Sequence, residues 1–357
     1  MFISRLDIKD LRVVSEISIE PGRRLNFITG SNGAGKTSIL EAIYLAGRGR
    51  TFRHADSGPL IRLGAECTTV VVKFSAGGPG TQKVSTLGIR REKRDFFCRL
   101  DGEDVKRRSV LAEALPVQWI GSQPQLLLDL GPEVRRRVID MGLFHVEHPY
   151  LQLMSQFQKV LKQRNAAIRQ GKADSLSAWN SPFVESALSV DRLRKQFVSE
   201  LAERTSNLVG SWNQDIDVSI SYNQGWERDL PLSEALQKKT DVDLRLGYTR
   251  RGPQRAELEI RAGNALASKT LSRGQQKMLI LAVNLALHDL IVERRGVTPI
   301  LLIDDLAAEL DRDNRARVIS EIEKRGGQAF LTRIEETSLR SQTDGTTMFH
   351  VEQGALK

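Results

Sequence analysis

Apolar residues at both ends of the chain follow the pattern of a mixed α/β domain. Residues 25–29 form an apolar run that leads into a glycine-rich segment, and residues 37–46 then carry apolar side chains at helical spacing. The last third alternates in the same way, with helices and strands predicted at 274–292, 299–304, 312–324 and 328–332. The two ends therefore predict one α/β domain built from distant parts of the chain.

Two other patterns lie between these ends. Residues 66–120 alternate as short strands separated by turn residues, which predicts a β-rich subdomain. After Gly131-Pro132, two helical stripes follow, at 150–168 and 183–208, joined by residues 170–175. At 1.5 Å per residue, two helices of about 25 residues would each reach roughly 38 Å, which is a short antiparallel arm.

These patterns predict a discontinuous head with an inserted arm. We expect the N-terminal part of the head in residues 1–130, a mainly helical arm domain in 131–255 and the C-terminal part of the head in 256–357. Short alternating segments at 216–222 and 256–260 add a few strands near the second boundary.

The charge favours a polyanionic partner. The 357 residues carry a net charge of +9, with 40% hydrophobic and 27% charged residues, which is typical of a folded globular protein. Cys67 and Cys98 have no metal-ligand spacing and form no disulfide framework. The most apolar stretch, 278–287, is too short to span a membrane, and charged residues interrupt the N-terminus. We therefore expect a cytoplasmic protein without a membrane partner.

The glycine-rich segment fits the phosphate-loop pattern G-x-x-x-x-G-K-[ST]. Its residues are Gly30, Ser31, Asn32, Gly33, Ala34, Gly35, Lys36 and Thr37. Backbone N–H groups at the start of the following helix would hold a β-phosphate. Lys36 would reach the β- and γ-oxygens, and the Thr37 hydroxyl would ligate Mg²⁺. The segment predicts that ATP and Mg²⁺ are the cofactors.

Two later segments complete the nucleotide chemistry. Ser272, Gly274 and Gln275 precede a predicted helix whose N-terminus would face an anion. About 30 residues further on, an apolar strand ends in Asp304 and Asp305, and Asp304 would hold Mg²⁺ directly or through water. The two acids lie far along the chain from the phosphate loop, and a Ser-x-Gly-Gln element precedes them. This order and spacing of motifs resembles that of the ATP-binding-cassette class of ATPases.

That class resemblance implies roles for these residues. Ser272, Gly274 and Gln275 of one copy would cap the ATP held by another copy, so ATP would drive formation of a homodimer. Asp305 stands where these ATPases usually place a Glu that orients the attacking water, and the shorter Asp predicts slow hydrolysis with Lys36 and Asp305 as catalytic residues. The loop at Leu310 and Asp311 would contact the second head, while Gln123 is either an Mg²⁺ or water contact or a solvated loop residue.

Longer strings extend the resemblance over nearly the whole chain. In collinear order the sequence resembles the RecF family of bacterial recombination mediators, in the strings Arg48–Arg53, Gly131-Pro132, Leu161–Asn165, Arg251–Arg255 and Ser272–Lys277. Gln254 and Glu257 depart from the His and Asp that are usual in this family, and the strand ending Leu331-Thr332-Arg333 carries no His.

The family resemblance implies a function in recombinational repair. An ATP-bound dimer would engage gapped duplexes or junctions between single and double strands. With RecR and RecO it would promote RecA loading, replication restart and the SOS response, and weak DNA-stimulated ATPase activity would reset the switch.

Candidate DNA contacts are basic clusters whose individual residues the sequence does not assign. They comprise Arg48, Arg50 and Arg53; Arg90, Arg91, Lys93 and Arg94; Lys106, Arg107 and Arg108; and Arg135, Arg136 and Arg137. Aromatic residues make up only 6% of the chain, which favours backbone contacts with duplex DNA over base stacking.

Three other functions compete with this hypothesis. The ATPase subunit of a membrane transporter belongs to the same cassette class, but it would not explain the basic charge or Arg273, which stands where those subunits usually have glycine. A chromosome-organising protein would need a longer arm. A kinase would leave residues 272–276 unexplained.

Overall fold

The computed structural model describes most of the chain, in two compact units. The described residues are 1–53, 59–76, 83–121, 126–147, 149–171, 173–212, 216–305, 310–333 and 345–357. One unit comprises Met1–Pro124 and Ile291–Lys357, and the other comprises Gln125–Leu290. The expected boundaries were 130/131 and 255/256, so residues 256–290, including Ser272, group with the arm unit and not with the head. We call the first unit the head and the second the arm unit.

The head contains a six-stranded, mainly parallel sheet. Its order is β15-β14-β3-β13-β12-β8, with bounds β15 Ala355–Leu356, β14 Thr347–Glu352, β3 Leu25–Thr29, β13 Ala329–Thr332, β12 Ile300–Ile303 and β8 Val117–Ile120. Only the β14–β15 pair is antiparallel. Every residue of β3, β12 and β13 is buried, as expected for central strands covered on both faces.

The second sheet of the head is antiparallel. Its order is β2-β1-β4-β5-β6-β7, with bounds β2 Val14–Ile19, β1 Phe2–Leu11, β4 Cys67–Ala76, β5 Lys83–Glu92, β6 Phe96–Leu100 and β7 Glu103–Asp104. Buried residues alternate with partly or fully exposed ones along much of β4 and β5, so one face belongs to the core and the other faces outward. This sheet confirms the predicted β-rich subdomain.

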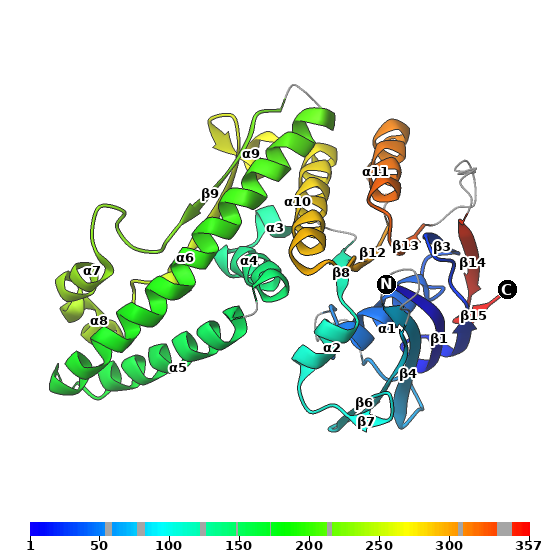
Figure 1. Cartoon of the computed structure of the whole chain (residues 1–357), viewed down its shortest axis with the longest axis horizontal. Coiled ribbons are helices and arrows are strands. Elements are labelled where there is room, and N and C mark those ends of the chain that lie inside the picture. The colour runs from blue at the N-terminus through cyan, green and yellow to red at the C-terminus, as the bar shows by residue number, and fades with distance from the viewer. Residues whose placement is uncertain are drawn as a thin grey trace. The chain divides into compact units, whose positions relative to one another are not determined.

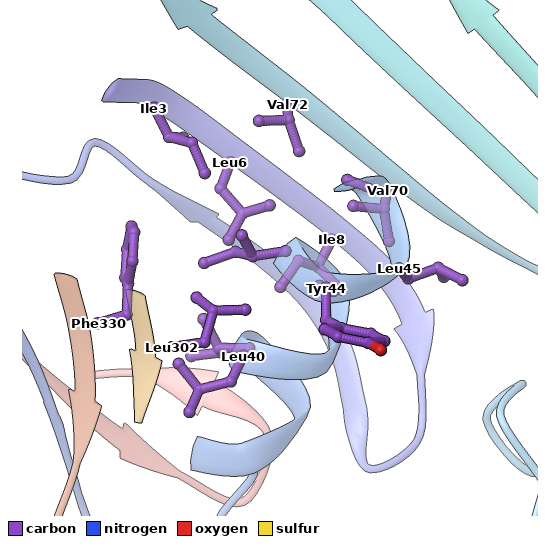
Figure 2. Close-up of a cluster of buried hydrophobic side chains, with 14 of the residues drawn as sticks. Ile3, Leu6, Ile8, Leu40, Tyr44, Leu45, Val70, Val72, Leu302 and Phe330 are labelled. Carbon is purple, nitrogen blue, oxygen red and sulfur yellow. The ribbon is translucent and has the colours of Figure 1, made fainter. Parts of the chain in front are cut away.

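Helix α1 (Lys36–Arg48) joins the cores of the two sheets. Nearly all its residues are buried, which identifies it as a core helix. Figure 2 shows Leu40, Tyr44 and Leu45 of α1 beside strand residues of both sheets, and all belong to one apolar cluster. The phosphate loop therefore leads directly into a helix that is packed in the core of the head. Two further helices of the head are α2 (Arg108–Ala114) and α11 (Arg312–Arg325).

The arm unit is mainly helical, as predicted. Its helices are α3 Leu126–Asp129, α4 Pro132–Val146, α5 Tyr150–Arg169, α6 Ala173–Trp212, α7 Leu232–Lys238, α8 Thr240–Leu246 and α9 Ala267–Thr270; α10, Arg273–Arg295, continues into the head. A short 3₁₀ turn, Pro253–Arg255, precedes a small antiparallel sheet in the order β11-β10-β9, with bounds β11 Ala265–Leu266, β10 Glu257–Ala262 and β9 Val218–Asn223.

The two arm helices differ in length, contrary to expectation. Helix α5 has 20 residues and α6 has 40, so the second helix reaches about 60 Å where roughly 38 Å was predicted. Helix α6 continues through Pro182, at a position where we expected the helix only to begin. The two helices lie side by side in Figure 1.

Largely buried ion pairs link the helices of the arm unit. Arg164 of α5 is fully buried and donates to Asp243 and Thr249. Arg194 of α6 donates to both carboxylate oxygens of Asp140 at 2.9 Å. Among the helices that the structure describes, none is both long and apolar enough to cross a membrane.

Candidate nucleotide site

The phosphate loop depends on glycines in the left-handed backbone region. Gly30, Gly33 and Gly35 have φ angles of 143°, 80° and 114°, which side-chain-bearing residues rarely adopt. A Cβ atom on Gly30 would lie 2.2 Å from the carbonyl oxygen of Val351 in β14. Gly35 is the N-cap of α1, so the backbone N–H groups at the start of this helix remain available to an anion.

Lys36 is folded back onto its own loop. Its Nζ donates at 2.8 Å to the carbonyl oxygens of Gly30 and Ser31. Burial lowers the pKa of Lys36, and the nearby carboxylates of Asp305 and Asp304 oppose that shift. An ammonium held this way needs little rearrangement to exchange carbonyl oxygens for phosphate oxygens.

The two halves of the predicted magnesium site meet in the head. The Thr37 hydroxyl lies 3.0 and 3.2 Å from the two carboxylate oxygens of Asp304, although the residues are 267 positions apart. Asp304 is largely buried at the end of β12. A hydroxyl and one carboxylate suit Mg²⁺, which is usually held by one or two carboxylates together with waters and substrate phosphates. These two residues would hold the ion, and the ion would supply charge neutralisation of the phosphates.

Thr332 was not predicted as a site residue, yet it fixes both acids. Its hydroxyl donates to Asp304 at 2.6 Å and accepts the backbone N–H of Asp305 at 2.8 Å. Asp305 has a φ of 50°, a left-handed conformation that Asp tolerates better than most residues. Thr332 lies at the end of β13, the strand that carries no His in this sequence.

A cleft of ≈ 560 Å³ surrounds these groups. Its lining includes the phosphate loop, Asp304, Asp305 and Thr332, together with Arg12 and Arg53. Pro59, Ile61 and Leu63 give one side of it an apolar surface. The volume lies within the range of typical small-molecule sites.

A buried carboxylate, which was not predicted as a site residue, orients the two arginines of the cleft. Glu41 of α1 is fully buried and accepts from Arg12 at 2.8 and 3.0 Å. Arg53 lies 3.4 Å from the same carboxylate, and the Thr51 hydroxyl also donates to it. Arg53 was predicted only as part of a basic DNA-binding cluster, whereas the structure places it in the cleft.

The Ser272 segment forms the N-terminus of α10. The Ser272 hydroxyl accepts the backbone N–H of Gln275 at 3.3 Å, and the Gln275 side chain accepts the N–H of Ser272 at 2.9 Å. This reciprocal pair is a capping box, and Ser272 itself is exposed. Arg273 forms an ion pair with Asp129, also in the arm unit. The segment thus forms a capped helix N-terminus with Ser272 exposed.

The remaining predicted residues have mixed outcomes. Gln123 lies outside the described residues. Leu310 is buried in the head, and the Asp311 side chain caps α11 by accepting the N–H of Asn314 at 2.7 Å. Both therefore have a role inside their own chain, whatever they contact elsewhere.

Several basic clusters are used inside the fold. Arg48 is buried, Arg135 pairs with Glu257 at 2.7 Å, and Arg136 donates to the carbonyl oxygen of Ala256. The exposed members of the clusters are Arg50, Arg90, Lys93, Arg94, Lys106, Arg107 and Arg108, with Arg137 paired to Glu133. The exposed cations therefore concentrate on the antiparallel sheet and the segment that follows it.

Comparisons with known proteins agree with this architecture. Residues 2–357 match the family described as "RecF/RecN/SMC N terminal domain". The DNA replication and repair protein RecF of Shewanella pealeana is 37% identical over 360 residues, covering 100% of this chain and 99% of the relative. The RecF of Pseudomonas fluorescens is 36% identical, with coverage of 100% and 98%.

Solved structures show the same fold. The structure titled "Structure of the recombination mediator protein RecF-ATP in RecFOR pathway" superimposes with a TM-score of 0.86 at 22% identity, covering 100% of this chain and 97% of the other. An Smc head bound to the C-terminal winged-helix domain of ScpA gives a TM-score of 0.60 at 18% identity.

The two-sheet head and its phosphate-loop cleft are typical of a cassette-type ATPase, with the head fold that RecF and SMC proteins share. The similarity to RecF proteins over the full length of the chain identifies the family within this class. The chain belongs to the bacterial RecF family.

Proposed function

We propose that this protein is an ATP-dependent DNA-binding protein of recombinational repair. Its ATP-bound dimer engages gapped duplexes or junctions of single and double strands, and acts with RecR and RecO to promote RecA loading, replication restart and SOS induction. Weak, DNA-stimulated hydrolysis of ATP resets the dimer.

The observation that carries this proposal is the meeting of Lys36, Thr37 and Asp304 in one cleft. These are the groups that phosphate, Mg²⁺ and a phosphoryl-transfer site require, and they come from opposite ends of the chain. The RecF relatives at 36–37% identity support the assignment to repair. A transporter subunit is not favoured, since the similarity to RecF relatives extends over nearly their full length and the net charge is +9.

The capping arrangement at Ser272 supports assembly through ATP. In the proposed dimer, the exposed N-terminus of α10 in one copy faces the γ-phosphate bound by the other copy. Asp305 orients the attacking water, and its short side chain keeps turnover slow.

The test is to measure the oligomeric state of the protein in solution with and without ATP, Mg²⁺ and gapped DNA. The wild type should form a dimer that depends on ATP. Lys36→Ala should lose nucleotide binding and the dimer together, whereas Ser272→Ala should bind ATP and stay monomeric. A liganded wild type that is monomeric at every concentration would refute the proposed assembly.

A control separates capping from assembly. Ser272→Ala also removes an N-cap, at a cost of about 1 kcal/mol, so its melting temperature must be measured. Ser272→Asn preserves a capping acceptor and still alters the phosphate-facing group. If both variants are folded and both fail to dimerise, the defect is one of assembly.

DNA binding should depend strongly on salt. If about six phosphates are neutralised, affinity should fall by roughly 10³ between about 50 and 200 mM salt.

The rate of ATP hydrolysis separates this proposal from the transporter alternative. The ATPase subunit of a transporter would hydrolyse ATP at the same rate with and without DNA.

A further inference from the structure

A second hollow lies on the outward face of the antiparallel sheet of the head. Its volume is ≈ 1030 Å³, and strands β4 to β7 and the segment before α2 line it. The opposite face of the same strands belongs to the core, where Val70, Leu87 and Ile89 are buried. We call this hollow the β5–β6 groove.

Strand register places an aromatic ring between cations on the outward face. Arg90 of β5 pairs with Phe97 of β6, and Gly88 pairs with Arg99, so these four residues share one face. Phe97 is 54% exposed, and it is the only phenylalanine classed as exposed among the residues that the structure describes. A flat ring is therefore presented to solvent beside two guanidinium groups.

Gly88 forms an open floor in this groove. A Cβ atom built on it would meet no atom within 4 Å, and the residue sits in the middle of β5. Glycine weakens a strand interior and often marks a place where a ligand approaches closely. Its backbone conformation is not strained, so a side chain could be added there without disturbing the strand.

More cations stand at the rim. Lys106, Arg107 and Arg108 line the same hollow, and Arg108 lies over the ring of Phe96 at 5.7 Å. Five cationic and two anionic side chains contribute to the lining. The two anions pair with cations at the surface, Glu92 with Arg90 and Asp104 with Arg99. Such exposed pairs are weak, so a phosphate can compete for the guanidinium groups.

We propose that the β5–β6 groove binds a single-stranded segment of DNA, with Phe97 stacking on a base and Arg90, Arg99 and Arg107 contacting phosphates. An exposed ring among cations suits a single strand, because the base faces of a duplex are already stacked. This inference rests on the proposed DNA-binding function and deepens it. It assigns the single-stranded part of a gap to the outward face of this sheet.

The test measures binding of the full-length protein, with ATP and Mg²⁺, to a fluorescent oligo(dT) of about 15 nucleotides. A blunt duplex of matched length serves as a second probe. Phe97→Ala should weaken oligo(dT) binding about tenfold and leave duplex binding nearly unchanged. Phe97→Tyr keeps an aromatic ring and should bind oligo(dT) like the wild type. Gly88→Val should fill the floor of the groove and weaken oligo(dT) binding while the protein remains folded.

A matched pair of arginine variants tests the phosphate contacts. Arg90 pairs with a carboxylate two residues away, and Arg5 does the same with Asp7 on β1, outside the groove. A plot of log affinity against log salt concentration has a negative slope. Arg90→Gln should make this slope shallower by about 0.7, and Arg5→Gln should not change it.

The outcomes separate this inference from the proposed function. If the wild type binds neither probe, the proposed function fails and the groove has no ligand of this kind. If the wild type binds DNA but Phe97→Ala and Gly88→Val bind oligo(dT) normally, the groove proposal alone is refuted. Equal losses for oligo(dT) and duplex would indicate a duplex backbone contact and would also overturn the single-strand assignment.

Discussion

Thr332→Val should destabilise the head and slow ATP hydrolysis without removing ATP binding. The substitution keeps the shape of the side chain and removes the hydroxyl that links Asp304 and Asp305. Asp304 then loses one donor, although Thr37 remains. The N–H of Asp305 loses its acceptor while its backbone stays in a left-handed conformation.

The expected magnitude follows from these two bonds. A hydrogen bond to a charged group contributes about 1.5–3 kcal/mol, and an unsatisfied buried N–H costs about 1–3 kcal/mol. The lower ends of both ranges add up to about 2.5 kcal/mol. For a unit of roughly 150–250 residues, this loss corresponds to a fall in melting temperature of about 5–10 °C.

Calorimetry and phosphate release measure the two effects. The unfolding transition that shifts upward with added ATP belongs to the head, because a ligand stabilises the unit that binds it. The rate of phosphate release should fall at least about tenfold at saturating ATP, since about 1.4 kcal/mol of lost positioning already gives that factor.

Thr332→Ser is the matched control, because it keeps the hydroxyl and loses only a methyl group. It should be much closer to the wild type in both assays. If Thr332→Val melts and hydrolyses ATP like the wild type, or if Thr332→Ser is equally impaired, then Thr332 does not position the acids and the reasoning is wrong.

Three other predictions follow from the head. Glu41→Ala should lower the melting temperature sharply, because leaving the largely buried Arg12 without its carboxylate should cost about 3–5 kcal/mol; an unchanged transition would contradict the importance of this pair. A thiol reagent at neutral pH should label Cys67 before Cys98 in the native protein, because Cys98 is buried and burial raises its pKa to about 11; equal rates in the folded state would contradict this. Asp305→Glu should speed phosphate release with little change in ATP affinity, because the added methylene brings the carboxylate closer to an attacking water; slower release would argue against that role.

Two elements of the last third could be predicted from the sequence. The largely polar helix α11 was expected at 312–324 and is found at Arg312–Arg325. Strand β12, an apolar run, was expected at 299–304 and is found at Ile300–Ile303. Such runs identify buried elements because every residue of a central strand is covered on both faces. Helix α4, Pro132–Val146, was missed because its arginine run was read as a DNA-binding cluster.

The local parts of the site were also predictable, and the long-range parts were not. The phosphate loop is a contiguous motif, so Lys36 and Thr37 could be assigned without a structure. Glu41 and Thr332 act on groups that only the fold brings near them, and no periodicity marks such residues. The same holds for Arg135, whose partner Glu257 is 122 residues away.

The position of β3 has a consequence for biosynthesis. Its two neighbours in the sheet are β13 and β14, and Gly354 donates its N–H to the carbonyl oxygen of Ala34 at 2.8 Å. A ribosome therefore makes the phosphate loop long before the two strands that flank it. A nascent chain should be unable to retain nucleotide until β13 and β14 have emerged and paired with β3.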